Sequence, residues 1–537
     1  MGGGLQDQLG QLREEILSLH QQAERLAAEK AELAKQRDAA LEARDLLAAR
    51  CKELNEQVQH LLHRLFGRKT EKFPNHPLLP FPEPEEPEPA PPPAVDEAPD
   101  EESEPSKPLK GRRRRVGRLR ADLPRQRIEI TLPESDRLCA DCNAPMQPFG
   151  EDVSERIDYK PAEVIIREYA RIKYSCPCCQ IGVKIGELPP AVIEKGMAEP
   201  GLLAQIAVAK YADHLPLDRQ EGIFRRHGID LPKSTMCDWI RDIAELLTPV
   251  VKEMKRDILK SHVIHTDDTG ITVLDRAAPG GSRKSYLWVY VGDQGDVVYD
   301  FTRTRGREGP IAFLGGYAGN LQADAYSGYD EVFREGRIVE IGCWAHCRRR
   351  FFDAAKLGSE VAVQVLQIIR ALYAVEKDAT DCGLTSEQRR VLRQDRSRPL
   401  LDAAKPWLEA EAQRALPKSI LGKAFAYCLK LWTPLTRYLD DGRLAIDNNR
   451  AEREMRCVAV GRKNWEFAGS DEGATRAATL YSLIASCRSH EINPWRYLTD
   501  VLGAISRHPA NRISEITPRG WKLAKAPAQP AATLVRS

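Results

Sequence analysis

The segment that decides the architecture is Ile446-Asp447-Asn448-Asn449-Arg450-Ala451-Glu452-Arg453-Glu454-Met455-Arg456. Read as a helix, it places Asn448, Glu452 and Arg456 on one face, because residues four apart lie one turn above each other. A carboxylate flanked by amides and guanidinium groups suits a site that holds a metal ion and binds phosphates. The alternative is a solvated helix start, with Asp447 as the N-cap and Glu–Arg pairs at helical spacing.

Aspartates far upstream, each in an apolar strand-like run, favour the functional interpretation. Residues 263–269 are expected to form a strand ending in Asp267 and Asp268, and residues 320–326 a strand with Asp324 near its end. Further strands are expected at 286–291, 297–301 and 340–344, with a short helix at 307–315. This order of elements is that of an RNase H-like α/β sheet whose first three strands are antiparallel.

In that fold the first and fourth strands are neighbours, so Asp267 and Asp324 are expected to face each other. Two adjacent carboxylates are electrostatically costly unless divalent cations neutralise them. Glu452, on a helix packed against the sheet, is expected to supply the third carboxylate. Oxygen ligands favour Mg²⁺ or Mn²⁺, and two such ions can activate a nucleophile and stabilise the leaving oxygen of a phosphodiester.

Other polar residues near these acids are candidates for phosphate contacts. His346 follows the fifth predicted strand, and it either binds phosphate or positions water, or it packs as a core histidine. The remaining candidates are Arg348, Arg349, Asn448, Asn449, Arg453 and Arg456.

The catalytic domain is expected to span residues 259–463, with a helical insertion at about 357–440. Helices inside the insertion are predicted at 361–377, 386–393, 406–416 and 423–440. Residues 461–473 have the composition of a loop. A C-terminal region, residues 464–537, follows with amphipathic helices at 475–489 and 494–506 that brace the helix of Glu452, and its Ala/Pro-rich tail after Trp521 is expected to be disordered.

The N-terminal region, residues 1–73, carries a leucine repeat with a period of seven. The repeat runs through Leu5, Leu12, Leu19, Leu26, Leu33, Leu47, Leu54 and Leu61. Together with the absence of Gly and Pro between residues 11 and 66, it predicts a coiled coil that makes the protein a homo-oligomer. The companion positions Lys30, Arg37 and Arg44 weaken its middle. The alternative is a long helix packed on its own domain.

Residues 74–126 combine an extended linker with a basic run. The linker is rich in Pro and Glu and has too few apolar residues to form a core, so it is expected to be disordered. The basic run that follows includes Arg112, Arg113, Arg114 and Arg115. Such a dense run beside candidate DNA-binding regions is expected to neutralise phosphates without reading sequence.

Residues 127–192 contain two CxxC pairs. The first pair is Cys139 and Cys142, and the second is Cys176 and Cys179, with Cys178 as a rival to Cys179. Two such pairs suit a tetrahedral, structural Zn²⁺ site with four thiolate ligands. A β-hairpin is expected between the pairs, because residues 164–173 alternate in polarity.

Residues 193–258 are expected to be helical. One helix is predicted to end at Gly228, and Ser234 or Thr235 is predicted to cap the next. This arrangement is compatible with a DNA-binding helix-turn-helix and, equally, with a plain helical hairpin.

The bulk composition is that of a multidomain chain of 537 residues. Lys+Arg 80 and Asp+Glu 78 nearly balance, but the acidic linker and the basic run are separate. An N-terminal apolar signal and an apolar run long enough to cross a bilayer are both missing from the sequence, so we expect a cytoplasmic protein with reduced thiols and no membrane partner.

Four motifs resemble those of one known family. They are His265-Thr-Asp267-Asp268-Thr269, Asp324-Ala-Tyr-Ser-Gly-Tyr329, Cys343-Trp-Ala-His346-Cys-Arg348-Arg349 and Asp447-Asn-Asn-Arg-Ala-Glu452-Arg453. Together with the leucine repeat, the four-cysteine finger and the Trp465-Glu-Phe-Ala-Gly469 segment, they resemble the DDE transposase of the insertion-sequence 66 family over nearly the whole chain. The family usually has Asp-Glu-Thr at the first motif, which leaves Asp268 as a rival to Asp267.

The resemblance implies a multidomain α+β protein that moves its own element. It implies cleavage and strand transfer at terminal inverted repeats, with target DNA and two small accessory proteins as further partners and a nucleoid-associated location when DNA is bound. The metal ligands implied are Asp267, Asp324 and Glu452. The alternatives are an RNase H-like nuclease or resolvase that cuts without joining, and an inactive DNA-binding protein derived from a transposase.

Overall fold

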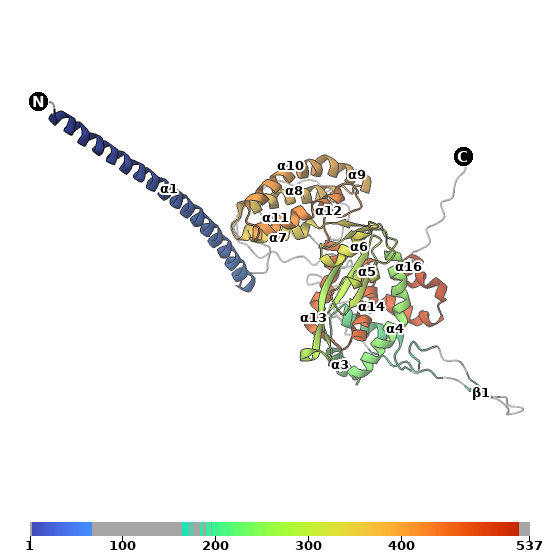
Figure 1. Ribbon diagram of the computed structural model, residues 1–537. Coiled ribbons are helices and arrows are strands. Elements are labelled where there is room, and N and C mark those ends of the chain that lie inside the picture. Colours follow the sequence, from blue (N-terminus) through green and yellow to red (C-terminus); the bar gives the residue numbers. More distant parts are fainter. Residues whose placement is uncertain are drawn as a thin grey trace, which may run out of the picture. The chain divides into compact units, whose positions relative to one another are not determined.

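The computed structural model describes residues 3–66, 164–170, 173–175, 183–185, 190–194 and 196–525 (Figure 1). Residues 1–2 and 526–537, the linker and basic run, and all four predicted zinc ligands lie outside these ranges. In the part of the chain that is described, none of the helices has the length and apolarity required to cross a bilayer.

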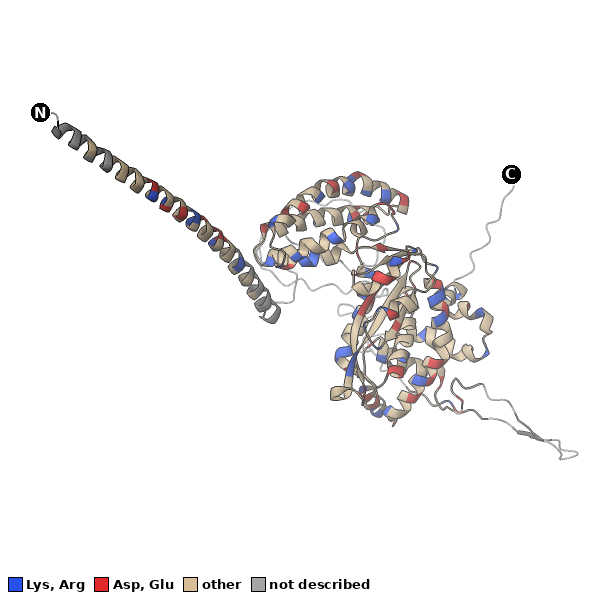
Figure 2. Cartoon of the chain, viewed as in Figure 1, with Lys and Arg blue, Asp and Glu red and all other residues tan. Residues whose placement is uncertain are grey.

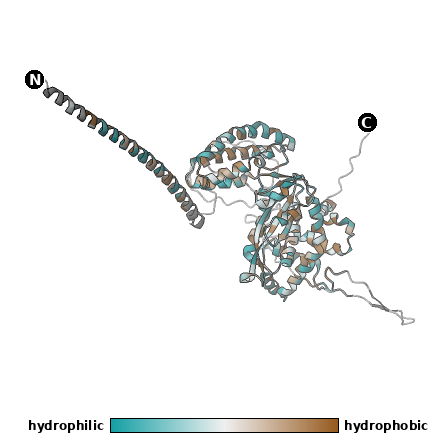
Figure 3. Ribbon diagram, viewed as in Figure 1, coloured by the Kyte–Doolittle hydropathy of each residue, from teal (hydrophilic) through white to brown (hydrophobic). Residues whose placement is uncertain are grey.

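The N-terminal region forms one helix, α1 (Gly3–Phe66), of 64 residues. Its length follows from the absence of helix breakers after Gly10. Four leucines of the predicted repeat are exposed, namely Leu26, Leu33, Leu47 and Leu54, and apolar and polar residues alternate along the helix (Figure 3). An exposed leucine repeat is what a coiled coil requires, and self-association through α1 stays a prediction.

A mixed sheet forms the centre of the folded region. Its strands are β3 (Val263–Leu274), β4 (Ser282–Gly292), β5 (Val297–Thr302), β6 (Gly319–Gln322) and β7 (Ile338–Ile341), in the order β5-β4-β3-β6-β7. The β3–β4 and β4–β5 pairs are antiparallel, whereas β6 and β7 run parallel to β3. The predicted adjacency of the first and fourth strands is therefore confirmed, with Ile264 opposite Leu321.

Helices cover both faces of this sheet. One face carries α13 (Asn449–Trp465), whose Glu454 carbonyl accepts a hydrogen bond from the Tyr299 hydroxyl of β5. The other face carries α5 (Glu308–Phe313) and α6 (Asp330–Arg334), and there the Tyr290 ring of β4 stacks on Phe313 with centroids 3.6 Å apart. One apolar core continues from Ala198 to Ile516 through both faces.

The outer edge of β5 is closed by α14 (Asp471–Ser489). Ser482 and Ser486 of α14 accept hydrogen bonds from the backbone N–H groups of Tyr299 and Val297 at 2.8 Å. An edge strand otherwise exposes unpaired N–H groups, so these serines prevent this edge from pairing with another chain.

Among the described residues, the helices between α1 and the sheet are α2 (Pro200–Tyr211), α3 (Leu217–Arg226) and α4 (Lys233–Ile258). The predicted cap of α4 was wrong, because the helix begins one residue before Ser234, and Pro232 is its N-cap without a side-chain hydrogen bond. Proline favours a helix start since its fixed φ suits the helix and it lacks an N–H.

Between β7 and α13 the chain is mainly helical, and this stretch includes the insertion predicted at about 357–440. Its helices are α7 (Trp344–Lys356), α8 (Glu360–Asp381), α9 (Ser386–Leu392), α10 (Arg398–Arg414), α11 (Ile420–Lys430) and α12 (Trp432–Thr436). Trp344, predicted to end a strand, instead opens α7. The predicted helix at 423–440 is interrupted at Leu431, and α10 begins well before Pro406, which it contains.

Acidic and basic residues are interspersed over the insertion and over the sheet with its helices (Figure 2).

The predicted loop at 461–473 was also wrong. Helix α13 continues to Trp465, Phe467–Ala468 form the short strand β8 parallel to β3, and α14 begins at Asp471. Gly461 lies inside α13, and the packing around it explains why this residue is a glycine. A Cβ there would stand 2.8 Å from Trp465 Nε1 and 3.0 Å from Tyr481 Oη. That glycine marks close packing and not a chain break. Helices α15 (Pro494–Ala504) and α16 (Pro518–Lys525) follow, so residues 522–525 of the predicted disordered tail are helical, and the rest of that tail lies outside the described residues.

The hairpin predicted at 164–173 lies later in the chain. Residues 164–170 have no regular secondary structure, and β1 (Lys173–Ser175) pairs antiparallel with β2 (Val183–Ile185). Alternation of polarity alone therefore misplaced the hairpin, since a strand also requires a partner. The second cysteine pair falls in the connection between β1 and β2, outside the described residues.

Candidate active site

Three elements bring the predicted acids to the sheet. Asp267 lies within β3, Asp324 follows the end of β6 by two residues, and Glu452 lies in the first turn of α13. Strands β3 and β6 are parallel neighbours, and α13 packs on β3. The strand containing Asp324 was predicted to continue to residue 326, but it ends at Gln322.

The pKa of Asp267 shows that the three acids interact electrostatically. The pKa of Asp267 is raised to about 7; burial is the largest cause, the charges of Asp324 and Glu452 add to the rise, and the hydrogen bond from the Asp268 backbone N–H opposes it. A carboxyl group that is buried and surrounded by like charge holds a proton at neutral pH unless a cation compensates it.

The turn after β6 orients Asp324. Ala325 adopts a left-handed backbone with φ 62°, an unfavourable conformation for a non-glycine residue. Asp324 Oδ1 accepts a hydrogen bond from the Tyr326 backbone N–H at 3.0 Å, and the Asp324 carbonyl accepts one from the Tyr427 hydroxyl at 3.2 Å. Strain at a position held by such contacts is typical of functional sites.

The two candidate acids of β3 point to opposite faces. Asp267 is paired across the sheet with Val289, and Asp268 with Trp288, so they alternate with the pleat. Asp268 receives three hydrogen bonds of 2.8–3.0 Å from Arg305, which also stands 3.8 Å from Asp324. Asp268 is therefore engaged by a guanidinium on the face away from α13, whereas Asp267 is influenced by the charge of Glu452.

Glu452 has a histidine and an arginine beside it. His346 Nδ1 lies 3.6 Å from Glu452 Oε1, and Arg349 lies 3.6 Å from Glu452 Oε2. Both Glu452 Oε1 and His346 Nδ1 are buried without a hydrogen-bond partner among the described residues. Burial lowers the pKa of His346, which favours its neutral form. Unsatisfied buried donors and acceptors are rare, and they indicate a site for an ion or ligand.

The two predicted asparagines hold the start of α13. Asn448 is fully buried, donates to the Thr266 carbonyl at 2.8 Å and stands 3.3 Å from His265 Nδ1. Asn449 donates both its backbone N–H and its side-chain amide to Asp447. Their amides are thus used inside the protein, and Asn448 in particular lies away from solvent.

Among the basic candidates, Arg349, Arg453 and Arg456 are exposed, whereas Arg348 is half-buried. Arg112, Arg113, Arg114 and Arg115 lie outside the described residues. The sequence reasoning missed Arg305 and Tyr373, whose hydroxyl donates to Asp447 at 2.8 Å. Neither residue belongs to a motif, and only the fold places them at the site.

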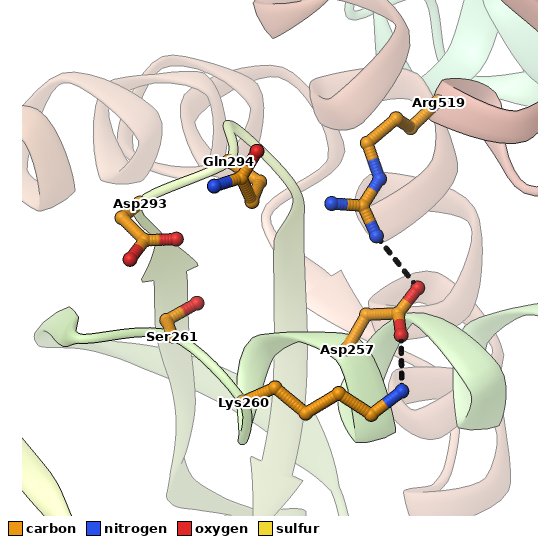
Figure 4. A pocket seen from close by; sticks show the side chains of 6 residues that line it. All are labelled: Asp257, Lys260, Ser261, Asp293, Gln294 and Arg519. Carbon is orange, nitrogen blue, oxygen red and sulfur yellow. Dashed lines mark hydrogen bonds and ion pairs between the residues drawn. The ribbon is translucent and has the colours of Figure 1, made fainter. Parts of the chain in front are cut away.

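A surface hollow elsewhere on the molecule is lined by Asp257, Lys260, Ser261, Asp293, Gln294 and Arg519 (Figure 4). Both cations there bind the same carboxylate: Arg519 lies 2.7 Å and Lys260 2.8 Å from Asp257. The hollow lies beside the start of β3 and the β4–β5 turn, so it does not include the three acids.

Comparison with known sequences identifies the family of the chain. The model described as Transposase IS66 family matches residues 195–476. Further models match a zinc-finger binding domain of transposase IS66 at residues 136–180, an IS66 C-terminal element at 482–518, and Transposase C of IS166 homeodomain at 53–128.

Two relatives match most of the chain. The uncharacterized protein y4hP of Sinorhizobium fredii (strain NBRC 101917 / NGR234) is 33% identical over 430 residues, which are 75% of this chain and 76% of the relative. The uncharacterized protein y4jD of the same organism is 33% identical over 448 residues, which are 80% of this chain and 86% of the relative. The chain belongs to the IS66 family of transposases.

Proposed function

We propose that this protein is a DDE transposase that binds the ends of its insertion sequence and catalyses metal-dependent DNA strand cleavage and strand transfer. The observation that carries the proposal is the position of the three acids: Asp267 lies in β3, Asp324 just beyond the neighbouring strand β6, and Glu452 in the first turn of α13, which packs on β3. The raised pKa of Asp267, to which the charges of Asp324 and Glu452 contribute, agrees with this arrangement. A group of carboxylates of this kind is suited to divalent cations.

The sheet supports an RNase H-like catalytic domain. Three antiparallel strands, β3 to β5, are followed by β6 and β7 on the other side of β3. This is the order expected for that fold. Asp267 lies in β3, and Asp324 lies just beyond the neighbouring strand β6. The insertion then separates β7 from α13, the element of Glu452.

The residues present fit Mg²⁺ or Mn²⁺. Asp267, Asp324 and Glu452 offer only oxygen ligands, and Glu452 Oε1 is buried without a hydrogen-bond partner among the described residues. When bound, two such ions would activate the attacking water or DNA 3′-hydroxyl and stabilise the leaving oxygen.

Other residues of the chain position the acids and meet the DNA. Arg305 neutralises Asp268 and stands near Asp324, while Asn448 fixes the start of α13 against β3. The exposed Arg349 and Arg453 are suited to phosphate contacts, which would hold the scissile strand without reading its sequence. His346, beside Glu452, is suited to contact a phosphate oxygen or water.

The N-terminal regions would recruit DNA and a second copy of the chain. The match to a zinc-finger domain implies Zn²⁺, for which Cys139, Cys142, Cys176 and Cys179 are the proposed ligands, all outside the described residues. Arg112, Arg113, Arg114 and Arg115 would add non-specific phosphate contacts. Helix α1 would join two or more copies, and small accessory proteins of the same element are further proposed partners.

The decisive experiment is the substitution Asp324→Asn. It removes one charge from the cluster and keeps the shape of the side chain, so we expect cleavage of labelled end DNA to fall by at least about a thousandfold. Binding of the same DNA should stay within about twofold, because phosphate contacts come mainly from basic residues. The matched control is Asp330→Asn, an exposed acid six residues further along, which should cleave at the normal rate.

Two assays separate the rival functions. With a supercoiled target present, joined product supports a transposase, whereas released ends without joined product would favour a nuclease or resolvase. Absence of cleavage by the unaltered protein in Mg²⁺, with DNA binding retained, would favour an inactive DNA-binding descendant. Cleavage by Asp324→Asn at the normal rate would refute the assignment of the acids.

A further inference from the structure

Glu452 also belongs to a second set of metal-ligand atoms. Cys343 Sγ, His346 and Glu452 each place one ligand atom within 4.8 Å of the others. Cys343 is the N-cap of α7 and His346 lies in the first turn of that helix, whereas Glu452 lies in the first turn of α13. The set therefore spans the junction of two helices that are far apart in the sequence.

The geometry of two of these atoms is already close to that of a zinc site. His346 Nδ1 and Glu452 Oε1 are 3.6 Å apart, too far for a hydrogen bond, and both are buried without a partner in the described part of the chain. Ligand atoms around tetrahedral zinc, with bonds of about 2.0–2.3 Å, are separated by roughly 3.3–3.8 Å. Since all three atoms lie within 4.8 Å of one another, the thiol would have to approach by no more than about 1 Å to complete three ligands.

Burial raises the pKa of the Cys343 thiol to about 12, so the thiol keeps its proton without a metal, but one contact suits a metal-bound sulfur. Cys343 Sγ accepts a hydrogen bond from the Asn448 backbone N–H at 3.2 Å. A donor of this kind orients a metal-bound sulfur and stabilises its negative charge. Arg349, 3.6 Å from Glu452, and Arg350 oppose a cation, whereas a Cys343 thiolate and the Glu452 carboxylate favour one.

We propose that Cys343, His346 and Glu452 bind a thiophilic divalent cation, represented by Zn²⁺, and that this binding inhibits the Mg²⁺-dependent reaction. Zinc replaces the proton of the Cys343 thiol, which is released to solvent, and occupies Glu452 as a ligand. The inhibitory part rests on the proposed function, because it requires Glu452 to be a ligand of the catalytic ions. The binding part depends only on the three side chains.

Binding is tested on the full chain with Zn²⁺ as the probe. Unaltered protein and Cys343→Ser are equilibrated with zinc, dialysed, and analysed for zinc per chain. We expect the variant to hold about one zinc fewer, since serine is a poor zinc ligand but still accepts the Asn448 hydrogen bond, while the four finger cysteines remain in both proteins. Cys487→Ser, which removes a buried thiol in α14, should hold as much zinc as the unaltered protein.

Inhibition is tested as the ratio of end cleavage with and without zinc at fixed Mg²⁺, taken separately for each protein. At free zinc about ten times its Kd, the unaltered protein should lose about tenfold in rate, because roughly one chain in ten keeps Glu452 free. Cys343→Ser should lose less than about twofold under the same conditions.

The outcomes separate the two claims. Equal zinc content in unaltered protein and Cys343→Ser would overturn the site. A zinc difference with equal inhibition would overturn the inhibitory claim, since zinc would then act elsewhere. Failure of every protein to cleave DNA would count against the proposed function and leave the zinc difference standing. If Cys343→Ser does not fold, His346→Ala replaces it, and equal zinc content would again overturn the site.

Discussion

Two charged clusters in this protein are built in opposite ways. In the insertion, Arg393 is fully buried and donates to both oxygens of Glu376 at 2.7 Å and to the carbonyls of Tyr438, Asp441 and Leu444 at 2.6–3.0 Å. At the candidate active site, Asp267 is half-buried near like charges, and Glu452 Oε1 has no hydrogen-bond partner among the described residues.

The difference separates a structural cluster from a functional one. Buried charges are tolerated when they are paired and fully hydrogen-bonded, as those of Arg393 and Glu376 are. Carboxylates that lack such partners cost free energy, and a chain retains them where a cation or substrate supplies the compensation. Each of the following experiments alters one of the two clusters, or a residue that holds it, and tests this difference.

The largest effect on stability is expected from Arg393→Met. It leaves Glu376 buried without its main partner and three carbonyls without a donor, so the free energy of unfolding should fall by about 3–5 kcal/mol. Urea denaturation followed by circular dichroism measures the change. The double variant Arg393→Met/Glu376→Leu should recover part of the loss, because it removes the orphaned charge as well. A single variant as stable as the unaltered protein would contradict the structural role.

A change of opposite sign, an increase in the free energy of unfolding, is expected from Asp267→Asn in the absence of divalent metal. The substitution removes a buried charge whose pKa is raised to about 7, so at pH 8 it should stabilise the metal-free protein by a few kcal/mol, at about 1.4 kcal/mol for each pKa unit. With Mg²⁺ present, the unaltered protein should become the more stable of the two, since only it has the full ligand set. Asp268→Asn is the matched control and should not stabilise, because it breaks the ion pair with Arg305.

The same carboxyl group predicts a pH dependence of stability. Between pH 4 and 7 the folded metal-free protein retains a proton on Asp267 that the unfolded chain has lost, given the ordinary value of 3.8. The contribution of this retained proton to the free energy of unfolding is therefore complete below about pH 4 and is lost as the pH rises through about 7. Asp267→Asn should lack this loss, and denaturation at a series of pH values in a chelator measures the difference. Parallel pH profiles for the two proteins would contradict the raised pKa.

The sequence predicted the strands and their order well, because apolar runs and turn residues are local signals. It also pointed to Asp267, Asp324 and Glu452, since acids in or just after apolar strand-like runs and at a helix start have few structural uses. Three of its failures share one cause: Pro406, Gly461 and Ser234 were read by local preference, whereas packing decided their conformation. Arg305 and Arg393 could not be assigned roles, because their partners lie far away in sequence.

The smallest effect is expected at the hydrogen bond that links α8 to the start of α13. Tyr373, on α8 of the insertion, donates its hydroxyl to Asp447, which in turn accepts the Asn449 N–H at the start of α13. Tyr373→Phe should therefore cost about 1–2 kcal/mol in unfolding free energy, and it should slow cleavage because Glu452 lies on the same helix turn. Tyr427→Phe, whose hydroxyl makes a longer bond of 3.2 Å to a neutral carbonyl, should cost less. If Tyr373→Phe lowers stability and leaves cleavage unchanged, the insertion supports the fold of α13 but does not set the position of its carboxylate.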